Sequence, residues 1–190
     1  MEMPLNLESP RPVRLTVDEL SLLHEAGALD RHHHVELIGG MLFEMSPQRR
    51  THSYARNELT FRLHDALRTL RSDLRVQGEV TVALSADNAP QPDIVLTSQP
   101  KGDGYIPGES VRIVVEVAVS SLAFDLGEKK RIYAGASIGE YWVVDIPGAQ
   151  VHQFWSPADG TYRETRIVPL AGPLASVTID GLAIDGTGIL

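Results

Sequence analysis

Three acidic residues fall on predicted strands, where carboxylates are least expected: Glu36, Asp93 and Glu116. Glu116 is the most informative, because it interrupts an otherwise almost wholly apolar run from Val111 to Val119. A carboxylate in such a run must be paired, protonated or bound to a metal, since leaving it charged and alone costs several kcal/mol. Simpler interpretations stay open: Glu116 could pair with an arginine or a backbone N–H, and Asp93, which follows a proline, could cap a turn.

Together the acids predict more than each does alone. Asp93 and Glu116 lie on consecutive predicted strands, and if these strands pair, the two carboxylates can converge on one divalent cation. Such a cation can neutralise charge on a scissile phosphate and make a bound water nucleophilic near neutral pH. A lysine beside it would stabilise the developing negative charge. Because the chain has no cysteine, we expect a hard, oxygen-bound cation, Mg²⁺ or Mn²⁺.

The first half of the chain supplies the elements that must position Glu36 and Asp93. A capping box at Thr16–Glu19 predicts a short first helix. Residues 35–38 and 41–43 predict two strands joined by Gly39-Gly40, with Ser46-Pro47 closing the hairpin, because a type I′ turn needs positive φ at both central residues. A long helix is predicted from His52 onward by apolar residues at helical spacing, and alternation over residues 74–84 predicts one half-buried strand.

The second half of the sequence predicts two parallel strands joined by a helix. Residues 92–96 and 111–119 are predicted strands, residues 125–134 a helix ended by Gly135, and residues 141–144 a further buried strand, with Tyr141 and Trp142 in the core. The segment 111–144 should therefore form a strand–helix–strand crossover. Short strands at 151–155 and 162–168 predict an antiparallel β extension of the same sheet. We interpret residues 1–190 as a single α/β domain with its core at about 13–170.

The composition and net charge of the chain limit the classes of protein to which it could belong. With 190 residues, 43% hydrophobic residues, no membrane-length apolar run and no secretory signal, we expect a soluble cytoplasmic protein. The net charge of -8 counts against a protein that coats nucleic acid. Arginines are nevertheless concentrated between positions 49 and 75; a solvated helix face is the simpler interpretation, and a phosphate-contacting face is the alternative.

Several motifs occur in an order typical of one family. They are Glu36-Leu37-Ile38-Gly39-Gly40, Ser46-Pro47 with His52, Pro92-Asp93, Val115-Glu116-Val117 with Ser120, then Asp125, Lys129, Tyr133 and Gly135, and finally Glu140-Tyr141-Trp142-Val143-Val144-Asp145. Over residues 13–170 this pattern resembles the Uma-type family of bacterial "putative restriction endonucleases". The resemblance implies the PD-(D/E)XK nuclease fold, a mixed β-sheet flanked by helices, and magnesium-dependent cleavage of DNA.

The resemblance also implies roles for single residues. Asp93 and Glu116 resemble the two metal-binding acids of the motif, and Glu36 the acid upstream of them. The usual lysine would fall on Ala118, so Lys129 takes its place, because it lies one helical turn before Tyr133; Lys130 competes with it.

Two further positions bear on the site. His52 resembles the family's histidine near the helix start, where it could contact phosphate or an acid or serve only packing. Gly39 stands where the family usually has Asp, which puts activity in doubt if that Asp belongs to the site.

The hypothesis is a magnesium-dependent endonuclease that hydrolyses DNA phosphodiesters with Glu36, Asp93, Glu116 and Lys129, and that could be a homodimer if it cuts both strands. Its rival is a catalytically inactive nuclease-fold protein that binds nucleic acid or a protein partner.

A third interpretation is a metal-binding protein that uses His32-His33-His34. It is disfavoured, because consecutive histidines on a loop point in different directions and are expected to be exposed.

Overall fold

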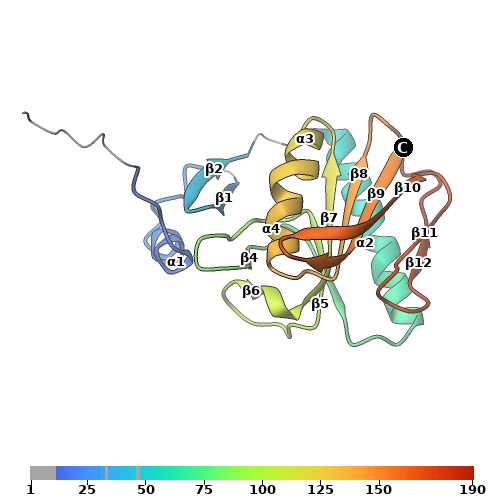
Figure 1. Cartoon of the computed structure of the whole chain (residues 1–190), viewed down its shortest axis with the longest axis horizontal. Helices are drawn as coiled ribbons and strands as arrows, with labels where there is room; N and C mark the ends of the chain where they lie inside the picture. Colours follow the sequence, from blue (N-terminus) through green and yellow to red (C-terminus); the bar gives the residue numbers. More distant parts are fainter. Residues whose placement is uncertain (1–11, 33, 46–47) are drawn as a thin grey trace, which may run out of the picture.

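The computed structural model describes residues 12–32, 34–45 and 48–190, and its centre is a six-stranded mixed sheet (Figure 1). The strand order is β10-β9-β8-β7-β5-β3, in which β7 and β8 are parallel and every other neighbouring pair is antiparallel. The bounds are β3 Arg75–Gln77, β5 Ile94–Thr97, β7 Val111–Ala118, β8 Glu140–Asp145, β9 Gln150–Ala158 and β10 Thr161–Pro169. The predicted pairing of the strands next to Asp93 and Glu116 is confirmed, as is the antiparallel extension.

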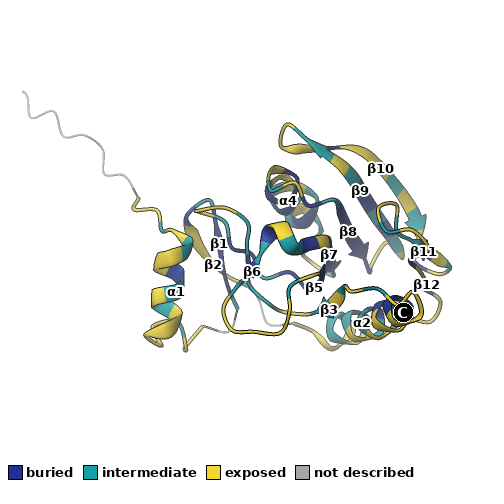
Figure 2. Cartoon of the chain, turned by 90° about the horizontal axis from the view of Figure 1, so that it is seen from below, coloured by how far each residue is buried: buried dark blue, intermediate teal, exposed yellow. Residues whose placement is uncertain are grey.

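Helices cover the two faces of this sheet. The long helix α2 (Arg50–Thr69) packs its Leu59 and Leu63 on one face, together with alternate residues of β7 and β8 such as Val115 and Trp142. Helix α4 (Lys130–Gly135) packs Tyr133 on the other face, with Tyr141 of β8. Figure 2 shows α2 and α4 on opposite sides of the sheet. Because side chains alternate along a strand, Glu116 lies on the α4 face.

The segment between β7 and β8 is helical from Leu122 to Gly135, so it begins three residues before the predicted helix 125–134, and it is not one regular α-helix. It consists of α3 (Leu122–Phe124), a π-helical turn η2 (Asp125–Lys129) and α4. Its predicted parallel crossover is confirmed by the β7–β8 pairing. π-turns inside helices are frequent at functional sites, and this one contains Lys129.

The N-terminal elements sit beside the sheet on its α3 side (Figure 1). Helix α1 (Val17–Glu25) begins at the predicted capping box, which is formed in full by Thr16 and Glu19. Strands β1 (Val35–Ile38) and β2 (Met41–Glu44) form the predicted hairpin, whose turn is Gly39-Gly40 with φ of 56° and 75°. Ser46 and Pro47, expected to close it, lie outside the described residues.

The single strand predicted over residues 74–84 is wrong. The chain forms β3 and then β4 (Val82–Ala83), which pairs in parallel with β6 (Ile106–Pro107), followed by a short 3-10 turn η1 (Gly108–Ser110). The alternating pattern breaks at Gly78 and at Glu79, whose φ is +53°. A Cβ at Gly78 would lie 3.0 Å from the Asp93 carbonyl oxygen, so this close backbone approach favours glycine there.

The core extends past residue 170. A C-terminal hairpin of β11 (Pro173–Ala175) and β12 (Ala183–Asp185) lies against α2, and its Leu174, Leu182 and Ile184 are buried in the same cluster as the α2 leucines. In the described part of the chain, no helix is both long and apolar enough to cross a membrane.

The hairpin turn gives a stability test. A Cβ at Gly40 would lie 2.7 Å from Cβ of Arg14 and 3.1 Å from the Leu15 carbonyl oxygen, whereas one at Gly39 meets only the Arg14 guanidinium at 3.4 Å. We expect Gly40→Ala to lower the free energy of unfolding by about 2 kcal/mol or more, and Gly39→Ala by about 1 kcal/mol from its left-handed φ alone. Urea unfolding of both variants measures the difference; equal losses would contradict the contact with Arg14.

Candidate active site

Glu36, His52, Asp93, Glu116 and Lys129, the residues singled out from the sequence, line one cavity of about 740 Å³. They reach it from separate elements: Glu36 from β1, His52 from the first turn of α2, Asp93 from the residue before β5, Glu116 from β7 and Lys129 from η2. All but the half-buried His52 are buried. The fold therefore brings together every predicted site residue.

Lys129 is the centre of the cluster. Its Nζ donates to Glu36 Oε1 at 3.0 Å and to Glu116 Oε1 at 2.9 Å, and Tyr133 donates its hydroxyl to the same Glu116 oxygen at 2.7 Å. The expectation that Lys129 and Tyr133 share the inward face is confirmed. Lys130 faces away, with its ammonium 5.0 Å from the centre of the Phe154 ring. Ala118 is fully buried on the same strand face as Glu116.

Asp93 is held by donors from three directions. Its Oδ2 accepts the Val117 backbone N–H at 2.8 Å and lies 3.1 Å from His52 Nε2, while its Oδ1 accepts Gln48 Nε2 at 3.3 Å. The Asp93 N–H itself donates to Glu116 Oε2 at 3.3 Å. Of the roles considered for His52, the structure shows contact with an acid.

The charges in the cluster do not balance in pairs. Burial raises the pKa of Glu116, and the carboxylates of Asp93, Asp125 and Glu36 add to this rise, against the Lys129 ammonium that lowers it. Burial alone would lower the pKa of Lys129, but the surrounding acids outweigh it and keep the amine protonated. Burial opposes ionisation of Asp93, yet His52 and the Val117 N–H bring its pKa below the ordinary value. One ammonium thus faces more buried carboxylate than it can neutralise.

Some carboxylate oxygens in the cavity lack strong donors. Among the residues that the structure describes, Glu36 Oε2 is buried with no hydrogen-bond partner, and Glu116 Oε2 accepts only the long bond from Asp93. Within the described ranges, no three or more Asp, Glu, His or Cys side chains are arranged as around a bound metal ion. The donor set nevertheless fits a hard divalent cation, because the available ligands are carboxylate oxygens and one of them is an orphaned buried acceptor.

Sequence reasoning assigned no role to Asp125, which the structure places in the same cavity. It is buried on η2 and accepts the Ser121 hydroxyl at 2.6 Å, and burial raises its pKa. The signal was present, since Asp125 precedes Lys129 by the same four residues that separate Lys129 from Tyr133.

Two sequence expectations about neighbouring positions need comment. The histidine run was expected to be exposed; His32 is, but His34 is half-buried in the cavity wall, with Nε2 3.9 Å from Glu36 Oε1, because it immediately precedes β1. His33 lies outside the described residues. Gly39 is not part of the cavity lining: its N–H donates to Asn88 Oδ1 at 2.9 Å and its carbonyl accepts from Arg14, so the position serves the turn.

A second buried acid shows what a purely structural carboxylate looks like in this chain. Glu140 of β8 accepts hydrogen bonds from Trp142 Nε1, Ser176 Oγ, and the backbone N–H groups of Val177 and Thr178. Both of its oxygens are satisfied by neutral donors, and they anchor the C-terminal segment. Glu36 differs from this pattern, because one of its oxygens contacts an ammonium and the other has no partner within the described ranges.

Comparison with known proteins shows the family and the fold of the chain. A family model named Uma2 and described as "Putative restriction endonuclease" matches residues 18–185. The chain belongs to the Uma2 family. Among solved structures, it is similar to one titled as a "putative nuclease belonging to DUF820" from Anabaena variabilis, with a TM-score of 0.68 and 15% identity over 94% of this chain and 97% of that one. That likeness shows the fold. A search of curated proteins gave no match.

The Lys129 contacts predict a large stability effect in this Uma2 protein. Lys129→Met leaves Glu36 and Glu116 buried without their counter-charge, so we expect it to lower the free energy of unfolding by about 3–5 kcal/mol. Lys130→Met, the matched control, removes only a cation–π contact and should cost about 1 kcal/mol or less. Chemical denaturation at neutral pH gives both values. If the two variants are equally stable, the ion cluster does not hold the acids as described.

Proposed function

We propose that this protein is a magnesium-dependent endonuclease that hydrolyses DNA phosphodiester bonds. The observation that supports the proposal most directly is the convergence of Glu36, Asp93, Glu116 and Lys129 in one cavity. One buried carboxylate oxygen there has no hydrogen-bond partner in the described part of the chain. Membership of a family described as restriction endonucleases supports it independently.

Glu36, Asp93 and Glu116 would hold the cation. Bound Mg²⁺ would neutralise charge on the scissile phosphate and lower the pKa of a coordinated water. The protein's own groups keep the acids in place: Val117 N–H and His52 orient the Asp93 carboxylate, and the Tyr133 hydroxyl orients Glu116.

Lys129 supplies the fixed positive charge of the site. Its amine keeps its proton because acids surround it, so Nζ can stabilise negative charge that develops on a phosphate entering the cavity. His52 Nε2 contacts Asp93, and its Nδ1 is buried with no hydrogen-bond partner among the described residues, so the proposed role of His52 is to hold Asp93 and not to contact phosphate.

Plasmid nicking tests the chemistry. With supercoiled plasmid and Mg²⁺ or Mn²⁺, we expect Asp93→Ala and Glu116→Ala to abolish nicking, because each removes a proposed cation ligand. Glu164→Ala, which removes an exposed acid of β10, is the control and should keep wild-type activity. Circular dichroism verifies that each variant is folded. Full activity in a folded Asp93 or Glu116 variant would remove the mechanism, and a wild type that binds plasmid without cutting it would favour the inactive binding protein instead.

Cation binding has a readout that does not depend on turnover. A cation at about 100 times its Kd contributes roughly 2.7 kcal/mol to stability, which raises the Tm by about 5–10 °C for a chain of this size. Thermal unfolding with Mg²⁺ and with chelator should show this shift in wild type. Glu36→Gln keeps the shape of the side chain but removes one proposed ligand charge, so it should erase most of the shift, whereas Glu164→Gln should retain it. A full shift in Glu36→Gln would exclude Glu36 from the cation site.

A further inference from the structure

The outward face of α2 carries two aromatic residues between two arginines, and the candidate site uses none of the four. Arg50, Tyr54, Phe61 and Arg68 are all exposed. Arg68 follows Arg50 by 18 residues, about five whole turns, and Tyr54 and Phe61 fall at about one and three turns between them. The four side chains therefore form one stripe about 27 Å long.

The aromatic members of this stripe are unusual for a soluble surface. Tyr54 is 56% exposed and Phe61 66%, although the opposite face of the same helix buries Leu59 and Leu63 almost completely. Large exposed rings that recur on one helix face are candidates for a binding surface.

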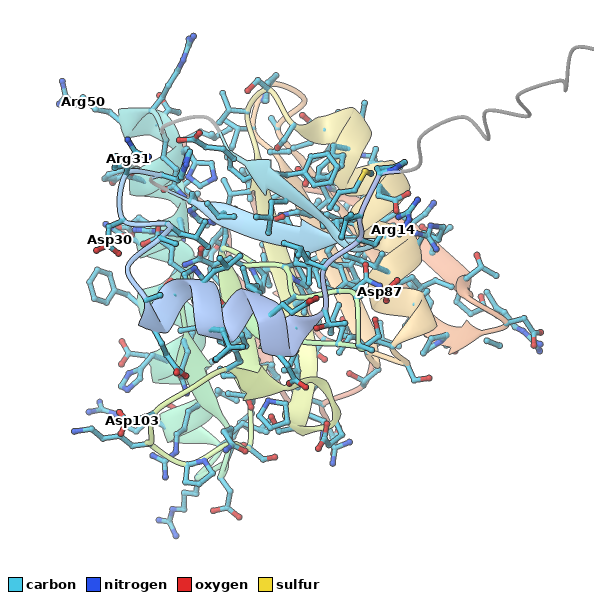
Figure 3. All side chains as sticks on the ribbon, turned by 90° about the vertical axis from the view of Figure 1, so that its left-hand side faces the viewer. Arg14, Asp30, Arg31, Arg50, Asp87 and Asp103 are labelled. Atoms are coloured by element: carbon cyan, nitrogen blue, oxygen red, sulfur yellow. The ribbon has the colours of Figure 1, made fainter. Side chains whose placement is uncertain are left out.

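The basic members are available to a ligand. Arg50 and Arg68 form no ion pair with any residue that the structure describes, whereas Arg56 and Arg62, elsewhere on α2, are paired with Glu79 and Glu58. Figure 3 shows Arg50 projecting from one end of α2. The acids of α2 are Glu58 and Asp65 against four arginines, so the helix is net positive in a chain of net charge -8.

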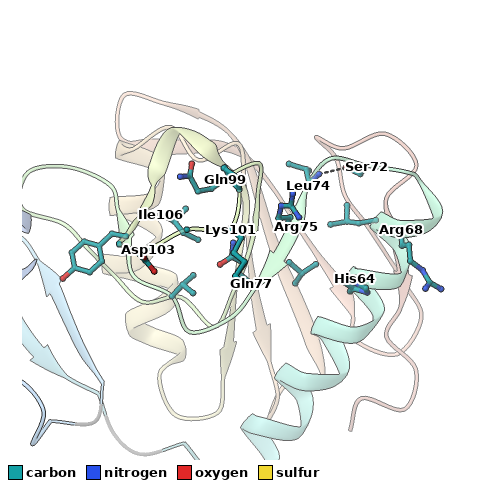
Figure 4. Close-up of a pocket in the computed structure, with 17 residues that line it drawn as sticks. His64, Arg68, Ser72, Leu74, Arg75, Gln77, Gln99, Lys101, Asp103 and Ile106 are labelled. Atoms are coloured by element: carbon teal, nitrogen blue, oxygen red, sulfur yellow. Dashed lines mark hydrogen bonds between the residues drawn. The ribbon is translucent and has the colours of Figure 1, made fainter. Parts of the chain in front are cut away.

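A cavity lies near each end of the stripe. At the N-terminal end, Arg49, the residue before α2, lines the candidate active-site cavity. At the other end, Arg68 lies on the wall of a second cavity of about 550 Å³, between the end of α2, the edge strand β3 and the loop 99–106 (Figure 4). Arg75 and Lys101 also line that cavity, and neither pairs with an acid within the described residues, while Asp103 is the acid among its lining residues.

We propose that this α2 stripe, defined as Arg50, Tyr54, Phe61 and Arg68, binds single-stranded DNA that leads from the candidate active site toward the Arg75–Lys101 cavity. Guanidinium groups at the ends suit phosphates, and exposed rings between them offer stacking faces for unpaired bases. Paired bases in a duplex are already stacked and cannot use those rings, so the aromatic residues favour a single strand. The choice of DNA rests on the proposed function; the binding surface itself does not require cleavage.

Fluorescence anisotropy with a labelled 30-nucleotide oligodeoxythymidylate, in chelator so that no cleavage occurs, tests the surface. Tyr54→Ala/Phe61→Ala should weaken binding by roughly fivefold or more for each ring. Its control is Ile167→Ala/Val177→Ala, which removes two comparably exposed apolar side chains elsewhere. A 30-base-pair duplex should bind less tightly and should respond little to loss of the rings.

Salt dependence tests the arginines. Arg50→Gln/Arg68→Gln should reduce the slope of log K against log salt by about 1.4, since each phosphate contact to a single strand contributes about 0.7. The control Arg131→Gln/Arg163→Gln removes the same charge from exposed arginines outside the stripe and should leave the slope unchanged.

Three results would overturn the inference. The first is a wild type that does not bind the oligonucleotide, and the second is an equal loss of affinity in the stripe and control variants. The third is a dimer, seen by sedimentation velocity, that Tyr54→Ala/Phe61→Ala dissociates without changing DNA binding. The last would assign the stripe to a second copy of the chain. A protein that binds through the stripe but never nicks plasmid would remove the proposed hydrolysis and keep this inference. An active nuclease with oligonucleotide binding insensitive to these residues would remove this inference alone.

Discussion

The buried contact of the Lys129 ammonium with Glu36 and Glu116 is the constraint around which this structure is arranged. Each partner comes from a different element, so the hairpin β1–β2, the central strand β7 and the helical segment after it must all be in place before the charges can meet. A charge enclosed without its partner would cost several kcal/mol, and this penalty favours the one arrangement in which the three elements converge. The same requirement makes the site sensitive to changes in distant parts of the hairpin.

Strand geometry explains why the lysine comes from a helix. Glu116 lies on the face of β7 that α4 covers, and Ala118, two residues on, lies on the same face. The small Ala118 side chain cannot carry a charge to Glu116, whereas the π-turn before α4 presents Lys129 to it. The positive charge beside Glu116 therefore comes from the helical segment that covers the sheet and not from β7 itself.

The contrast between Glu36 and Glu140 separates two uses of a buried acid. Glu140 receives several neutral donors and fastens the C-terminal segment to β8. Glu36 has an oxygen with no donor among the described residues, in a cavity that several acidic side chains line. Neutral donors satisfy a carboxylate permanently, while an unsatisfied oxygen retains the capacity to bind a cation. Burial of an acid alone therefore does not identify a candidate site. The hydrogen-bond partners of each carboxylate oxygen are the more informative observation.

The sequence by itself predicted most of the local elements and the residues that meet in the cavity. The capping box at Thr16, the Gly39-Gly40 turn and the apolar strands are decided by interactions within a few residues, and carboxylates on apolar strands marked Glu36, Asp93 and Glu116 because an unpaired buried charge is so costly. The choice of Lys129 over Lys130 followed from helical phase.

Only the tertiary structure decided what those residues contact. The 74–84 strand breaks at Gly78, which does interrupt the local pattern, but the close approach of the Asp93 backbone to Gly78 is seen only in the folded chain. The burial of His34 and the place of Asp125 in the cavity depend on packing between separate elements in the same way. The pairing of one ammonium with two acids is likewise a property of three chain segments together, because charge interactions act through space and not along the sequence.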